Sequence, residues 1–242
     1  MLLRSLCLAG FLSCSVIGFG QAKDSVPYYI VVEDETLVHR SFMFYDGKVL
    51  PYCISVGSPE KTHYSINSFN AALIKGWRGQ FLNANLMWVH KARGIGVAQP
   101  VGDEKQFGNE KAYASENNYK NNWGDSISVE DNCQFLGYDV DKQNRPLFRY
   151  KFNGSTIEDN IAVVEGNINR TINIVSPTSQ DTYFRLISGE EIKKISSTEY
   201  LIDNLIHIII PKKNNVFIQQ NGKRKLLLTK LSADFNYTIS WK

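Results

Sequence analysis

The hydrophobic and polar positions of this chain fall into short runs and not into long helical stripes. Apolar, aromatic and β-branched residues gather in stretches such as 27–33 (PYYIVVE) and 36–46 (TLVHRSFMFYD), and Gly, Asn, Asp and Pro separate these stretches. No segment carries a sustained helical repeat. Short runs rich in Val, Ile, Thr, Tyr and Phe between turn residues are typical of β-strands. The pattern therefore predicts an all-β protein.

The second half of the chain contains the clearest predicted strands. They cover 134–140, 146–152, 156–165 and 168–175, and further short runs continue to the C-terminal FNYTISW. The pairs Asn153-Gly154 and Gly166-Asn167 suit tight hairpin turns, because such turns need positive φ. Short strands at regular spacing indicate a sandwich or a barrel. We expect an antiparallel β-sandwich of the large or super-sandwich type.

Residues 91–132 interrupt this regularity with a stretch rich in Gly, Asn, Asp, Glu and Lys. An irregular segment of this length inside a domain is usually a functional loop or a disordered one. Its aromatic residues, among them Phe107 and Trp123, favour a loop packed on the scaffold, since disordered linkers are poor in aromatics. We expect one domain over 23–242 that includes this long loop, with 27–132 and 133–242 as possible lobes.

The first 22 residues have the layout of a secretory signal peptide. A positive charge at Arg4 precedes an apolar run, and Gly20-Gln21-Ala22 forms a small-residue site for cleavage after Ala22. This predicts a periplasmic or secreted protein without a transmembrane segment after cleavage. Anchoring as a lipoprotein through Cys14 is the less favoured alternative, because Phe11 fits poorly three positions before the cysteine.

The charge balance excludes one class of partner. The chain has 27 Lys and Arg against 24 Asp and Glu, and loss of Arg4 with the leader leaves 26 against 24, a net charge of +2. The short basic stretches KKNN and GKRK flank turns. We expect no nucleic-acid partner, because such a partner needs a concentrated basic face.

Two cysteines, Cys53 and Cys133, remain after removal of the leader. In an oxidising compartment the two thiols can form a disulfide. Their apolar surroundings, PYCISV and NCQFLGY, favour two separately buried thiols to the same degree. The sequence leaves both alternatives open.

The stretch 76–90, GWRGQFLNANLMWVH, concentrates aromatic and basic side chains ahead of the long loop. Trp77, Trp88 and Trp123 can form a platform on which sugar rings stack, because a flat aromatic face matches the apolar face of a pyranose. The competing interpretation places the tryptophans in the core, where large aromatics usually lie. The candidate ligand-binding residues are Trp77, Arg78, Trp88, His90, Arg93 and Trp123.

No established catalytic signature is present, since the chain lacks a haem-attachment CxxCH, a phosphate-binding glycine loop and a GxSxG elbow. The loop carboxylates of Asp103 and Glu104 are candidates for acid–base chemistry. His39, His63 and His90 lack the spacing of a metal site. We therefore expect no cofactor and no metal, and we treat a carbohydrate-active enzyme that uses loop carboxylates as the alternative function.

Several motifs resemble one family of secreted bacterial β-sandwich modules. The motifs are LVHRSF (37–42), WRGQFL (77–82) and FLGYDVDKQNRPLFRYKFNGSTIED (135–159), and spaced Trp88, Arg93-Gly94, Pro100 and Gly102 lie between them. Modules of this family, whose function is unknown, are fused to or encoded beside c-type cytochromes and sugar dehydrogenases of the pyrroloquinoline-quinone type.

The resemblance implies a β-sandwich and a type of partner, and it implies no chemistry. We expect an exported, non-catalytic accessory module that binds carbohydrate or a periplasmic c-type cytochrome or sugar dehydrogenase.

Overall fold

The computed structural model describes residues 28–88, 96–120, 123–124, 133–176, 181–211, 215–231 and 234–242. Within these ranges the chain forms eighteen strands and one short helix, α1 (Asn85–Trp88). The strands make three sheets, and all their ladders are antiparallel. The predicted all-β, antiparallel, sandwich-like architecture is confirmed. The predicted signal peptide lies outside the described residues.

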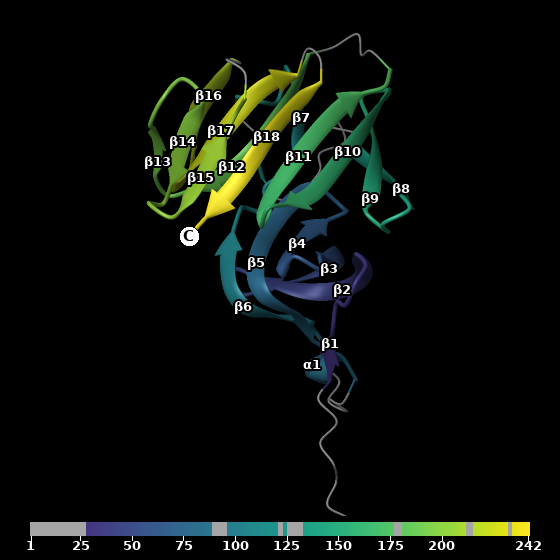
Figure 1. Ribbon diagram of the computed structural model, residues 1–242. Helices are drawn as coiled ribbons and strands as arrows, with labels where there is room; N and C mark the ends of the chain where they lie inside the picture. Colours follow the sequence, from purple (N-terminus) through teal and green to yellow (C-terminus); the bar gives the residue numbers. More distant parts are fainter. Residues whose placement is uncertain are drawn as a thin grey trace, which may run out of the picture.

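The N-terminal sheet contains six strands and curls back on itself (Figure 1). They are β1 (Tyr29–Ile30), β2 (Leu37–Tyr45), β3 (Lys48–Gly57), β4 (Thr62–Asn67), β5 (Ala72–Asn83) and β6 (Gln99–Gln106). The order is β1-β5-β4-β3-β2, and β6 also pairs with β5. The curl brings Ala98, just before β6, to β2, where its N–H donates to the carbonyl of Phe42 at 3.0 Å.

The other two sheets lie above the N-terminal sheet in Figure 1. The eight-stranded sheet has the order β13-β14-β15-β18-β11-β10-β9-β8, and the four-stranded sheet has the order β16-β17-β12-β7. The first comprises β8 (Cys133–Val140), β9 (Pro146–Phe152), β10 (Ser155–Val164), β11 (Asn167–Ile174), β13 (Ile192–Lys194), β14 (Glu199–Ile202), β15 (Ile206–Ile209) and β18 (Phe235–Trp241). The second comprises β7 (Tyr113–Ser115), β12 (Thr182–Gly189), β16 (Val216–Asn221) and β17 (Arg224–Leu231).

Two predicted turns connect strands of the eight-stranded sheet. Asn153 and Gly154 have φ of 48° and 84° between β9 and β10, as the turn residues predicted. The next turn is shifted by one residue from the prediction. Glu165 and Gly166 occupy it with φ of 52° and 71°, and Asn167 already pairs with Val164.

The predicted long loop is partly stranded. β6 pairs with β5 through eight residues, and β7 pairs with β12 of the four-stranded sheet. The prediction of an irregular segment over 91–132 is therefore wrong for these two strands. β7 also places residues 113–115 in a sheet with strands from the second half of the chain.

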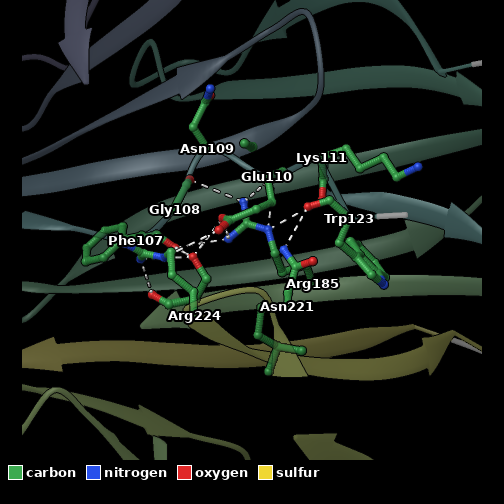
Figure 2. Close-up of polar contacts among 12 residues, drawn as sticks. Phe107, Gly108, Asn109, Glu110, Lys111, Trp123, Arg185, Asn221 and Arg224 are labelled. Atoms are coloured by element: carbon green, nitrogen blue, oxygen red, sulfur yellow. Dashed lines mark hydrogen bonds and ion pairs between the residues drawn. The ribbon is translucent and has the colours of Figure 1, made fainter. Parts of the chain in front are cut away.

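The segment between β6 and β7 crosses from one sheet to another, and the side chain of Arg185 on β12 holds it (Figure 2). The guanidinium, only 1% exposed, donates to the carbonyls of Phe107, Gly108 and Glu110 at 3.0, 3.3 and 2.7 Å. Every backbone carbonyl buried away from water needs a donor. One arginine thus supplies the donors that a strand partner would otherwise provide.

The largest hydrophobic cluster joins all three sheets. It includes Ile66 from the N-terminal sheet, Ile168 from the eight-stranded sheet and Phe184 from the four-stranded sheet, each 0% exposed. A second cluster fills the inside of the curled N-terminal sheet, and a third lies beside the four-stranded sheet. The three sheets therefore share the largest of these clusters as a common core.

An ion pair lies inside this shared core. Arg170 on β11 bonds both carboxylate oxygens of Asp159 on β10, at 2.9 and 2.6 Å, and both side chains are almost fully buried. The same guanidinium donates to the carbonyl of Ala71 in the β4–β5 turn of the N-terminal sheet at 3.1 Å and lies 5.0 Å from the ring centre of Phe184. Arg170 thus contacts all three sheets.

Candidate functional site

The two predicted platform tryptophans that the structure describes in full are buried. Trp77 on β5 is 0% exposed, stacks with Phe81 and donates its indole N–H to the Phe81 carbonyl at 2.8 Å. Trp123 is 2% exposed and belongs to the cluster beside the four-stranded sheet. The two indoles lie in different clusters and offer no face to a sugar ring. The prediction of a stacking platform that contains Trp77 and Trp123 is therefore corrected, because both residues occupy core positions.

The remaining predicted ligand-binding residues do not assemble beside them. Arg78 turns to the eight-stranded sheet, where it donates to the carbonyls of Trp241 and Gly166 at 2.6 and 3.0 Å and stacks over the Trp241 ring. It therefore joins two sheets. The backbone of Trp88 ends α1, and His90 and Arg93 lie outside the described residues.

The carboxylates proposed for acid–base chemistry lie on a strand and are engaged in ion pairs. On β6, Asp103 contacts the ammonium of Lys105 at 2.5 Å, and Glu104 contacts that of Lys75 at 2.8 Å. Lys75 is itself buried, so Glu104 neutralises an ammonium group that is shielded from solvent. These ion pairs give both carboxylates a structural role.

The described residues contain no group of three or more His, Cys, Asp and Glu side chains that could hold a metal ion. Over the same ranges, no helix is both long and apolar enough to cross a membrane.

Cys53 and Cys133 are thiols and do not form a disulfide with each other. Cys53 lies inside the curled N-terminal sheet, whereas Cys133 begins β8 of the eight-stranded sheet. Burial raises the pKa of the Cys53 thiol to about 12. The thiol is therefore protonated at neutral pH, and its reactivity is low because the thiolate is the nucleophile.

A row of exposed aromatic side chains crosses one face of the N-terminal sheet. It consists of Phe42 and Phe44 on β2, Tyr52 on β3 and Phe69 in the β4–β5 turn, which are 37%, 45%, 59% and 49% exposed. We call these four residues the aromatic row. The rings of Tyr52 and Phe69 are 5.8 Å apart and 23° from parallel.

The pairing of β2 and β3 explains how the aromatic row forms. Along β2, Ser41, Met43 and Tyr45 are buried while Phe42 and Phe44 are exposed, because successive side chains point to opposite faces. A bulge follows the Ser41–Cys53 pair, so that Pro51 and Tyr52 of β3 both lie opposite Phe42. The bulge thereby brings Tyr52 to the outer face beside Phe42.

A short turn fixes Phe69 against Tyr52. The backbone N–H and the hydroxyl of Ser68 both donate to the Tyr52 carbonyl, each at 2.8 Å. The Asn67 side-chain oxygen accepts from the Phe69 N–H at 3.1 Å. Two neighbours of Phe69 in sequence therefore hold its ring next to Tyr52, so this end of the aromatic row is preformed.

The aromatic row was not among the binding residues predicted from the sequence. Its signal was the alternation in RSFMFYD, which places aromatic residues on both faces of one strand. Contiguous apolar surface is uncommon on soluble proteins and marks interaction sites. The aromatic row is the exposed surface that best fits a binding role.

A cleft of about 420 Å³ separates the N-terminal sheet from the eight-stranded sheet at a different place. Its floor is aliphatic and includes Val56, Ile161 and Val163. Asp34, Glu35 and Glu60 also line the cleft, as do Lys142 and Arg145 from the β8–β9 hairpin. Asn144 of that hairpin donates to the Glu35 carboxylate at 2.6 Å. Part of the 135–159 motif therefore forms a wall of this cleft.

Comparisons of the chain with protein-family models, with curated proteins and with solved structures found no match.

Proposed function

We propose that this protein is a non-catalytic binding module that holds carbohydrate on the aromatic row. The observation that carries the proposal is the joint exposure of Phe42, Phe44, Tyr52 and Phe69 on one face. Aromatic rings bury a large apolar area and have few rotatable bonds, so a sugar ring can stack on them at a small entropic cost. Both rings of the stacked Tyr52–Phe69 pair are about half exposed.

Export is part of this proposal and rests on the sequence of residues 1–22. In the periplasm or outside the cell, the protein would meet polysaccharides and the enzymes that act on them. The resemblance to modules that accompany c-type cytochromes and sugar dehydrogenases supports the same setting.

A second candidate function uses the same surface. Exposed Phe and Tyr side chains are enriched where proteins bind each other. The aromatic row could therefore dock on a periplasmic c-type cytochrome or sugar dehydrogenase. The carbohydrate-active enzyme that uses the carboxylates of Asp103 and Glu104 is the third alternative.

The test of carbohydrate binding is calorimetric titration with soluble neutral polysaccharides and their oligosaccharides. Calorimetry does not depend on a tryptophan near the site, and Trp77, Trp123 and Trp241 are buried. We expect Tyr52→Ala combined with Phe69→Ala to weaken binding about tenfold or more, since stacked aromatic contacts contribute about 0.5–1.5 kcal/mol each.

Tyr29→Ala is the matched control, because Tyr29 is an aromatic residue of similar exposure, 43%, on β1 outside the aromatic row. An unchanged affinity in the double variant would contradict the site. Shortened oligosaccharide products that disappear in Asp103→Asn or Glu104→Gln would favour the enzyme. Binding to a cytochrome or dehydrogenase without any binding of carbohydrate would favour the docking module.

A further inference from the structure

Strand β10 extends beyond the strand that pairs with it at the cleft. β9 begins at Pro146, and its last pair with β10 is Leu147 with Asn160. On the other side, β10 stays paired with β11 up to Val164 and Asn167. Residues 161–164 thus have one paired edge and one edge that faces the cleft. Pro146 has no N–H with which to extend the β9 ladder.

The backbone groups on this open edge belong to Ile161 and Val163. The carbonyl of Ile161 accepts from the Tyr64 hydroxyl at 2.9 Å across the cleft, so it points away from β11. Backbone groups two residues apart in a strand point to the same edge. The N–H and C=O of Val163 therefore also point into the cleft, and within the described ranges no strand pairs with them.

The shape of the cleft suits an extended chain. A hollow of about 410 Å³ shares Asp34, Glu35 and Thr36 with it. Another of about 310 Å³ shares Arg145, Pro146 and Ala162 with it at the hairpin side. Two further hollows thus adjoin the cleft, so a segment lying in it has room to continue beyond it.

The charged residues that line the cleft indicate which kind of peptide would bind in it. Asp34, Glu35 and Glu60 line the cleft together with Lys142 and Arg145, but Arg145 is already paired with Asp141 at 2.7 Å. With Asp141 included, four carboxylates stand against two cations, a net charge of −2. Unpaired strand edges recruit extended peptides by β-strand addition, and charge complementarity selects among them.

We propose that the cleft binds an extended peptide segment of a partner protein, rich in Lys or Arg, which pairs with the open edge of β10 at Val163, since the Ile161 carbonyl is already bonded to Tyr64. The aliphatic floor would take the alternate apolar side chains of the segment, and the carboxylates of Asp34, Glu35 and Glu60 would contact its cationic ones. This site is separate from the aromatic row and independent of carbohydrate binding.

The test uses the whole mature protein and a fluorescent pentapeptide, Lys-Val-Lys-Val-Lys, with blocked termini. We expect saturable binding by fluorescence anisotropy. A twin peptide with an N-methyl group on the amide that would donate to the Val163 carbonyl should bind about threefold more weakly or worse, because one hydrogen bond is lost. A Glu-Val-Glu-Val-Glu peptide should show no binding. Equal affinity of the N-methylated twin, or no binding of the lysine peptide up to millimolar concentration, would overturn the proposal.

Two variants test the protein side of the same contact. Val163→Pro removes one edge N–H, and Asp34→Asn with Glu35→Gln removes two charges without touching the strand. Each should weaken peptide binding about threefold or more while carbohydrate binding to the aromatic row stays unchanged. Phe69→Ala is the reciprocal control and should leave peptide binding intact. Unaltered peptide affinity in the charge variant would overturn the assigned charge contacts, even if Val163→Pro does not fold.

Discussion

Two backbone groups hold His63 in one protonation state. Its Nδ1 accepts from the N–H of Ser58 and its Nε2 lies 3.1 Å from the carbonyl of Gly79, so Nε2 carries the proton. Burial lowers the pKa of this imidazole from 6.5, and the hydrogen bond to Gly79 opposes the change only in part. A second proton would have to displace the Ser58 N–H.

The lowered pKa of His63 predicts how stability depends on pH. Below about pH 6.5 the imidazole of His63 binds a proton in the unfolded chain but stays neutral in the folded chain. The free energy of unfolding therefore falls as the pH drops towards the pKa of the folded state. Urea unfolding at pH 7.5 and pH 5 should show a larger loss for the wild type than for His63→Gln. Burial also lowers the pKa of His39, so the variant keeps part of the dependence. The same loss in both proteins would contradict this role of His63.

At the residue scale, the sequence showed which side chains are aromatic or charged, but it did not predict which of them are exposed to solvent. Trp77 and Phe42 are both aromatic residues on strands of the N-terminal sheet, yet one is buried and the other lies on the surface. The difference depends on which face lies inside the curled N-terminal sheet, and alternation along one strand cannot reveal that. Core positions were the competing interpretation for the tryptophans, and the structure places Trp77 and Trp123 there.

At the scale of elements, polar strands were the hardest to predict. β6 has the sequence QPVGDEKQ, which lacks the apolar alternation of a strand, and most of its side chains are partly or fully exposed. It is a strand because it pairs along β5, and an ion pair between Glu104 and Lys75 links the two strands. Pairing of this kind depends on a neighbour and not on the propensities of the segment.

The crossing segment between β6 and β7 depends on one side chain, which gives a prediction at this scale. Arg185→Lys should lower the free energy of unfolding by about 3 kcal/mol, because a single ammonium cannot reach all the carbonyls and leaves some of them buried without a donor. Hydrogen exchange at residues 107–111 should become faster than in the wild type. Urea denaturation and exchange mass spectrometry would measure the two effects.

Arg145→Lys is the matched control, since Arg145 is an arginine 48% exposed that pairs with Asp141. Exposed ion pairs contribute about 0–1 kcal/mol, so this variant should stay within that range. Similar losses in Arg185→Lys and Arg145→Lys would show that the buried hydrogen bonds are not the cause.

For the whole molecule, the fold class followed from short strands and turn residues, but the division into three sheets did not. β7 pairs with β12, whose sequence is about 70 residues away, and no local pattern records such a partner. The hairpins of the second half were predictable because their turn residues select the connection.

The shared core predicts that the three sheets unfold together. Arg170→Met leaves the Asp159 carboxylate buried without its partner, which should cost about 3–5 kcal/mol. The contacts of Arg170 extend to all three sheets, so we expect one unfolding transition at a lower denaturant concentration. Far-ultraviolet circular dichroism and tryptophan fluorescence should report coincident midpoints. A separate early transition of the N-terminal sheet would contradict a single cooperative unit.

The open edge of β10 also bears on how this protein behaves at high concentration. An unpaired strand edge is a template for pairing between two copies of a chain, and such pairing leads to aggregation. Here the edge borders a cleft that the carboxylates of Asp34, Glu35 and Glu60 and the β8–β9 hairpin also line. Two copies that approached through this edge would bring the same carboxylates together. The charges suited to a basic peptide therefore also protect the edge from self-association.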